Sequence, residues 1–195
     1  MSLSKGLKSP VDVRQMVCGK AAALRWLALT YLFPLLLANV SAAELTGRVV
    51  GVADGDTITV LDASKKQHKI RLSGIDAPES KQAFGTRSKE SLSDMVHGKD
   101  VRADCPKIDR YGRQVCKVWV QPTDCPQCGD TLDVSYAQIS AGLAWWYRAY
   151  AKEQSPEDRG RYESEENEAR LRKRGLWADD APVPPWEWRR AKVPY

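Results

Sequence analysis

The sequence has little of what marks several common classes of protein. It contains two histidines, His68 and His97, and both lie outside the acidic and basic clusters described below, so we assign neither to a site. The longest apolar run, residues 26–38, contains Pro34 and is shorter than the ~20 residues that a membrane-spanning helix needs. No internal repeat is visible. The 195 residues therefore suit one domain of ordinary size preceded by a short leader.

The first 42 residues have the layout of an export signal. Basic residues precede the apolar run, and small residues at 40–43 follow it as a cleavage site. Met16 is an alternative start, since it leaves a basic stretch of more usual length. We expect residues 1–42 to be removed and the protein to be periplasmic or extracellular, a monomer without stable membrane association. An uncleaved membrane anchor is the alternative.

Net charge gives no argument for nucleic-acid binding. The leader carries five Lys or Arg residues and one Asp, so its removal lowers the formal net charge from +5 to about +1. The basic clusters at residues 170–174 and 189–192 are offset by the acidic run at 163–168, and such runs usually form solvated helix faces. Any electrostatic contact with a nucleic acid must therefore come from a local patch.

Cysteine usage agrees with export. Cys18 lies in the leader, so the exported part keeps an even four, Cys105, Cys116, Cys125 and Cys128. An oxidising compartment favours disulfides, and we favour the pairs Cys105–Cys116 and Cys125–Cys128 among the three pairings that four cysteines allow. A four-thiolate zinc site is the rival, because residues 125–128 have ligand spacing, although the other two cysteines form no close pair. The third possibility for these four cysteines is that they remain unpaired thiols.

Hydrophobic periodicity predicts a small barrel. Alternating, β-branched segments predict strands at residues 45–52, 57–61, 68–72, 101–103 and 114–120, and helical spacing predicts helices at 88–97, 134–141 and 155–174. Five strands with about three inserted and appended helices indicate a closed β-barrel of the OB type within residues 43–178. We expect residues 121–130 to form an inserted loop. Residues 179–195, rich in proline and tryptophan, are predicted to lie extended against the domain.

Three short clusters follow one another along the chain: Asp-Gly-Asp-Thr at residues 54–57, residues 71–79 from Arg71 to Glu79, and Asp-Arg-Tyr-Gly-Arg at residues 109–113. Each alone is weak, because Asp-Gly is a common hairpin turn and single arginines are often solvated. Together they supply oxygen ligands for a hard divalent cation from Asp56, Asp76 and Glu79. They also supply fixed positive charge for a phosphate from Arg71 and Arg113. The combination indicates a metal-dependent phosphodiesterase site.

These motifs, with Gly-Leu-Ala at 142–144 and Arg-Gly-Leu-Trp at 174–177, resemble those of the staphylococcal nuclease family across residues 45–177. The resemblance implies an exported Ca2+-dependent nuclease on an OB-type barrel. It would hydrolyse DNA, RNA or both, cutting the bond between phosphorus and the 5′ oxygen and leaving 3′ phosphates. The insertion at residues 121–130 and its cysteines depart from the family pattern.

The resemblance also implies roles for single residues. Asp56, Asp76 and the backbone carbonyl of Ala77 hold Ca2+, and Glu79 lies beside the attacking water. Arg71 and Arg113 bind the scissile phosphate.

Aromatic side chains near these motifs are candidates for contact with bases. Tyr111 follows the third cluster, and Trp145, Trp146, Tyr147 and Tyr150 form an aromatic segment that is able to stack bases without sequence preference. We take Tyr111, Tyr147 and Tyr150 as the substrate contacts.

Two other functions remain open at this point. A noncatalytic OB-type nucleic-acid binder predicts the loss of Arg71, Glu79 or Arg113, and all three are present. A zinc-stapled adaptor anchored in the membrane by its leader is the other alternative.

Overall fold

The computed structural model describes residues 44–191, so the predicted leader and cleavage site lie outside the described residues. The strands form a closed five-stranded mixed barrel. Its antiparallel strands are β3 (Gln67–Leu72), β2 (Thr57–Leu61), β1 (Leu45–Val52), β5 (Asp100–Ile108) and β6 (Gln114–Val120), in that order. Parallel pairing of β3 with β6 closes the barrel, as the OB-type prediction requires. A short strand, β7 (Leu132–Asp133), extends the sheet beyond β6.

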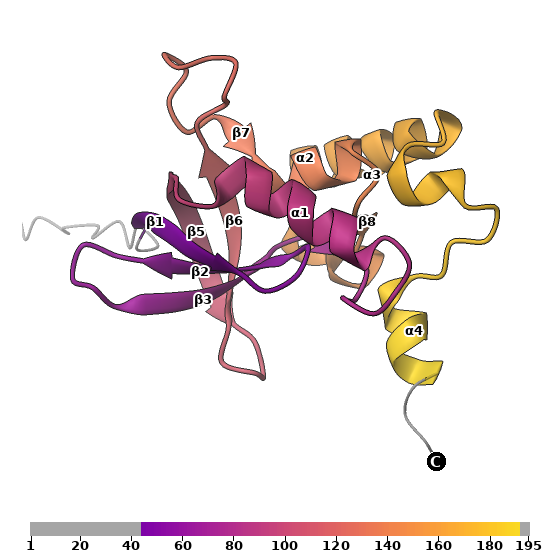
Figure 1. Ribbon diagram of the computed structural model, residues 1–195, viewed down its shortest axis with the longest axis horizontal. Helices are drawn as coiled ribbons and strands as arrows, with labels where there is room; N and C mark the ends of the chain where they lie inside the picture. The colour runs from indigo at the N-terminus through magenta and orange to yellow at the C-terminus, as the bar shows by residue number, and fades with distance from the viewer. Residues whose placement is uncertain (1–43, 192–195) are drawn as a thin grey trace, which may run out of the picture. The chain divides into compact units, whose positions relative to one another are not determined.

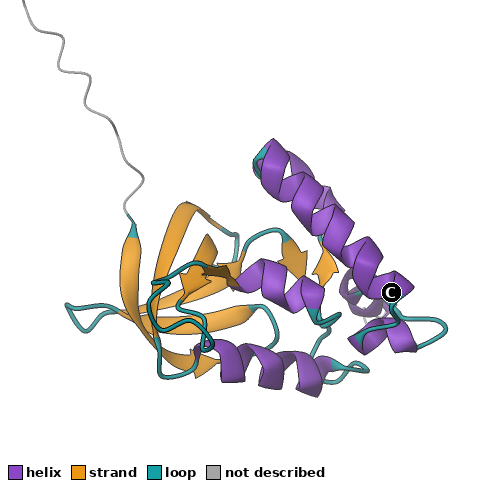
Figure 2. Cartoon of the chain, turned by 90° about the horizontal axis from the view of Figure 1, so that it is seen from above, coloured by secondary structure: helices purple, strands orange, loops and turns teal. Residues whose placement is uncertain are grey.

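Alternation along the strands builds the core. Val49, Ile58, Val60, Ile70 and Val118 are fully buried, and α1 (Gly85–Val96) adds Leu92 and Val96 to the same cluster. Figure 1 shows α1 in front of the strands, and Figure 2 shows strands gathered on one side with helices on the other. In residues 44–191 no helix is long and apolar enough to cross a bilayer.

Helices α2 (Val134–Ser140) and α3 (Pro156–Leu171) pack on each other and hold a second, two-stranded sheet. This sheet pairs β4 (Ile75–Asp76) with β8 (Trp145–Trp146). Glu166 on α3 is fully buried, and its carboxylate accepts the backbone N–H of Trp146 at 3.0 Å. Helix α3 therefore fixes β8, and β8 in turn fixes the strand that carries Asp76.

The cysteines form the two disulfides that we favoured, Cys105–Cys116 and Cys125–Cys128. The first joins the neighbouring strands β5 and β6, and its Cys116 is fully buried in the core. The second lies within the loop between β6 and β7 that the sequence predicts as an insertion.

The prediction of an extended C-terminal tail is wrong in part. Residues Pro185–Ala191 form α4, the fourth α-helix of the described chain. The described chain also contains two 3-10 helices, Arg148–Glu153 and Gly175–Ala178. The prolines do not prevent it, because Pro185 opens the helix, where a missing N–H costs no hydrogen bond. The first turn of the helix is closed by the N–H groups of Glu187 and Trp188, which both donate to the carbonyl of Pro184.

The Gly-Leu-Ala motif at residues 142–144 and the Arg-Gly-Leu-Trp motif at 174–177 meet where the backbones of Gly142 and Gly175 are in close contact. Both have positive φ, and the N–H of Leu176 donates to the carbonyl of Gly142 at 2.8 Å. A Cβ on Gly142 would lie 2.3 Å from the carbonyl oxygen of Arg174. Both glycines are therefore required by close backbone approach as well as by conformation.

We expect Gly142→Ala to lower the free energy of unfolding by about 3 kcal/mol, because it adds a clash with backbone to the cost of positive φ. Gly98→Ala is the matched control, since Gly98 has φ +74° but open space where its Cβ would lie. It should cost about 1 kcal/mol. Denaturant unfolding of the oxidised protein measures both; equal losses would contradict the role of close packing.

Candidate active site

The first acidic cluster forms the turn between β1 and β2. Asp54 accepts the backbone N–H of Asp56 at 3.1 Å, and Gln138 on α2 donates to the carbonyl of Gly55 at 2.8 Å. A Cβ on Gly55 would lie 1.8 Å from the hydroxyl of Ser88, so only glycine fits under α1. The turn is thereby fixed from both helices, and it leaves Asp56 3% exposed.

The second acidic residue, Asp76, lies on β4 and is fully buried. Its neighbour Ala77 donates its backbone N–H to Asp56 Oδ2 at 3.1 Å. The two carboxylates therefore belong to one connected cluster, although Asp56 comes from the turn between β1 and β2 and Asp76 from the second sheet.

Arg71 joins these two carboxylates. Pairing of β2 with β3 sets Arg71 opposite Thr57, and its guanidinium lies 3.1 Å from Asp56 Oδ2 and 2.7 Å from Asp76 Oδ1. Burial raises the pKa of the Asp56 carboxyl above its ordinary value, and the charge of Arg71 opposes that shift. The site thus contains a buried ion cluster in which Arg71 bridges two carboxylates.

Arg113 is held by the hairpin that joins β5 to β6. Asp109 accepts the backbone N–H groups of Tyr111 and Arg113, each at 2.9 Å, and its second oxygen accepts Arg113 Nε at 2.8 Å. Burial opposes the charged form of Asp109, but these hydrogen bonds lower the pKa of its carboxyl below the ordinary value. Arg113 Nη1 also lies 3.4 Å from the Thr57 hydroxyl, which brings this arginine next to the Asp56 turn. Asp109 is therefore a positioning residue.

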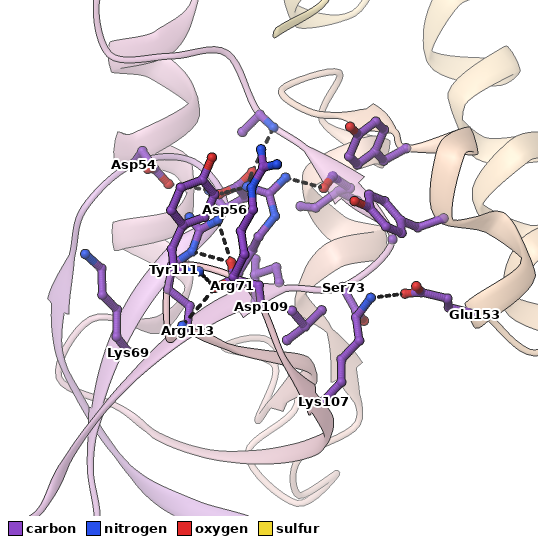
Figure 3. Close-up of a pocket in the computed structure, with 18 of the residues that line it drawn as sticks. Asp54, Asp56, Lys69, Arg71, Ser73, Lys107, Asp109, Tyr111, Arg113 and Glu153 are labelled. Carbon is purple, nitrogen blue, oxygen red and sulfur yellow. Dashed lines mark hydrogen bonds and ion pairs between the residues drawn. The ribbon is translucent and has the colours of Figure 1, made fainter. Parts of the chain in front are cut away.

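A pocket of about 630 Å³ opens onto these side chains. Figure 3 shows Arg71, Arg113, Asp56 and Tyr111 grouped together, with the pair Lys107 and Glu153 at another part of the wall. Glu79 and the backbone segment of Ala77 line the same pocket, whereas fully buried Asp76 lies behind it. The structure thus brings together every residue that we predicted for catalysis and metal binding.

The aromatic candidates divide into two groups. Tyr111, Tyr147 and Tyr150 line the pocket, and Tyr111 is 68% exposed. Trp145 and Trp146 are buried, with 7% and 4% exposed, so the part of the prediction that offered them as a stacking surface is wrong. Trp145 packs against Trp177 and Trp186, and Trp146 belongs to the main core, and neither contact is visible in the local sequence.

One residue at the site escaped sequence reasoning. Arg189, on α4, donates from Nη2 to Asp76 Oδ2 at 2.6 Å and from Nη1 to Glu79 Oε1 at 2.8 Å. The sequence alone predicts a solvated basic run at residues 189–192. The signal that was available is the pair of tryptophans followed directly by two arginines in the sequence Trp-Glu-Trp-Arg-Arg at residues 186–190.

The donor chemistry fits a hard divalent cation. Asp56, Asp76 and Glu79 offer only oxygen, the ligand that Ca2+ prefers, and two of the three are buried where a countercharge is required. Arg71 and Arg189 provide that countercharge here. Across residues 44–191 no three His, Cys, Asp or Glu side chains converge into a ready cluster for a metal. Binding of the ion therefore requires these carboxylates to exchange arginine contacts for metal contacts.

Comparison with known proteins gives the family of the chain. The sequence matches the family described as "Staphylococcal nuclease homologue" over residues 69–179. It is 40% identical to "Micrococcal nuclease" of Shigella flexneri over 172 residues, which cover 87% of this chain and 94% of the relative. It is 42% identical to an "Uncharacterized endonuclease" of Escherichia coli O157:H7 over 153 residues, 78% of this chain and 90% of the relative.

A plant relative, "Staphylococcal-like nuclease CAN1" of Arabidopsis thaliana, is 40% identical over 127 residues, which are 65% of this chain and 35% of the relative. The family match spans more than half of the chain, and the bacterial relatives extend over most of it. This chain therefore belongs to the staphylococcal nuclease family and is a nuclease, a hydrolase of phosphodiester bonds.

Proposed function

We propose that the protein is an exported, Ca2+-dependent nuclease that acts on DNA, RNA or both. It cuts between phosphorus and the 5′ oxygen and leaves a 3′ phosphate. The observation that carries the proposal is that Arg71, Arg113 and Glu79 line one pocket beside the buried carboxylates of Asp56 and Asp76. A phosphodiesterase needs this combination of fixed cations, a proton acceptor and oxygen ligands.

Arg71 and Arg113 bind the scissile phosphate. Each guanidinium keeps its charge at any working pH and donates two hydrogen bonds to phosphate oxygens in its own plane. Their contacts to Asp56, Asp76 and Asp109 fix both side chains before substrate arrives. Arg113 is held by Asp109, which is not a ligand of the ion, so charge that develops on the phosphate oxygens during in-line attack meets at least one donor that is already in place.

Glu79 accepts the proton of the attacking water. Its side chain is 39% exposed, which leaves room for a water, and its backbone N–H is anchored to Gln82 Oε1 at 3.1 Å. Asp56, Asp76 and the carbonyl of Ala77 would hold Ca2+, which when bound supplies positive charge to a nonbridging phosphate oxygen.

Arg113→Ala should lower the cleavage rate of single-stranded DNA or RNA by about 10²–10³, the usual loss for one donor to a charged transition state. Chelation of Ca2+ should abolish cleavage in the unchanged protein. Arg172→Ala is the control, since it removes one exposed arginine directly after α3 and should leave the rate unchanged. Cleavage of end-labelled oligonucleotides measures all three. Full activity in Arg113→Ala, or in chelator, would refute the site.

Glu79→Gln should reduce the rate by at least about 10², because general-base assistance of this kind contributes 10²–10⁴. The same variant must be tested for Ca2+ binding by calorimetry, so that loss of the ion is distinguished from loss of the base. A rate within a few fold of the unchanged protein would exclude Glu79 as the base.

Export is supported by the leader motif and by the two disulfides, which persist in oxidising compartments. Protein expressed from its first codon in a secreting bacterium should accumulate outside the cytoplasm, with an intact mass that corresponds to a start near residue 43. Replacement of two apolar residues in the 26–38 run by Lys should block both results. A full-length mass in the membrane fraction would indicate an uncleaved anchor instead.

A further inference from the structure

Helix α4 lies beside the active-site pocket and contributes side chains to it. Arg189 contacts Asp76 and Glu79, and its side chain is 41% exposed. Trp186 stacks on Tyr147, with ring centroids 5.4 Å apart and planes 8° from parallel. The segment before the helix is fastened to the loop that carries Glu79, because Gln82 donates to the carbonyl of Val183. Helix α4 lies outside the family match, which ends at residue 179.

A second groove, of about 820 Å³, continues from the pocket over α4. The two share Arg110, Tyr111, Tyr147 and Arg189 in their walls. The described residues that line the groove include four arginines, three aromatic side chains and no acidic one: Arg110, Tyr111, Tyr147, Arg148, Ala149, Trp186, Arg189 and Arg190. Arginines for phosphates beside aromatic faces for bases are what a single-stranded nucleic acid requires.

We propose that this groove is a nucleotide subsite, in which Trp186 and Tyr147 stack a base and Arg189 binds the phosphate next to the scissile one. The proposal rests on the nuclease function proposed above and extends it to a helix beyond the matched region. A substrate several nucleotides long would thus gain affinity that a dinucleotide lacks.

Arg189 is placed to pair either with the carboxylates of Asp76 and Glu79 or with a phosphate of the substrate. Without substrate it pairs with Asp76 and Glu79, whose negative charge a bound divalent cation would offset. The guanidinium is then free to pair with a phosphate, because its side chain already borders the groove. Arg189 therefore competes with the metal in the free protein and binds substrate in the loaded one.

The proposal is tested with the purified, oxidised full-length protein and two probes, a single-stranded pentathymidylate and a dithymidylate. Arg189→Ala and Trp186→Ala should each raise KM for the pentanucleotide about tenfold, the usual size of one stacking or charged contact, with kcat within about threefold. The dinucleotide should be affected much less. Arg189→Lys should recover part of the loss, and Arg172→Ala, the control at the C-terminal end of α3, should match the unchanged protein.

Fluorescence anisotropy of the labelled pentanucleotide separates failure of this proposal from failure of the nuclease function. Tighter binding of the pentanucleotide to the unchanged protein than to Arg189→Ala supports the subsite even when nothing is cut. Equal binding overturns it. A rise in cleavage rate in Arg189→Ala at saturating Ca2+, where competition with the ion has no effect, also overturns it, since α4 would then block the site.

Calorimetry with Ca2+ and no nucleic acid tests whether Arg189 and the ion compete for the carboxylates of Asp76 and Glu79. Arg189→Gln should bind Ca2+ several fold more tightly than the unchanged protein, and Arg172→Gln should not. Unchanged or weaker Ca2+ binding in Arg189→Gln would overturn the exchange between metal and phosphate.

Discussion

The ion cluster of Asp56, Asp76 and Arg71 is the constraint on which the rest of the site depends. A carboxylate removed from water needs a countercharge close by, and removal of one partner from such a cluster is far more costly than loss of a surface ion pair. Arg71 meets this need for two carboxylates at once. The strands that carry these residues must therefore keep their register for the cluster to exist.

Each member of the cluster comes from a different strand or turn. Arg71 is placed by the barrel strand β3, Asp56 by the turn before β2, and Asp76 by β4 in the second sheet. Helix α3 supports β4 indirectly through Glu166 and β8. The helices beside the barrel are thus part of the active site's framework, and a change in their packing reaches the catalytic carboxylates through one short strand.

Much of this was predictable from the sequence because the information is local. Alternation predicted four of the five barrel strands to within one residue, whereas β5 was predicted only at residues 101–103 and extends to Ile108. Asp-Gly and Tyr-Gly marked the turns at residues 54–57 and 109–113. Arg189 was missed because it contacts Asp76 across 113 residues of sequence, a contact that no local pattern reports. The burial of Trp145 was missed for the same reason, since the side chains of Trp177 and Trp186 that cover it lie more than 30 residues further along the chain.

The central claim is that the oxygen ligands and the arginines act on one phosphate. A crystal structure of the protein with Ca2+ and a phosphorothioate dinucleotide tests this most directly. The account predicts the ion on Asp56 and Asp76, and the phosphorothioate between Arg71 and Arg113. An ion bound elsewhere, or a dinucleotide that contacts neither arginine, would contradict it.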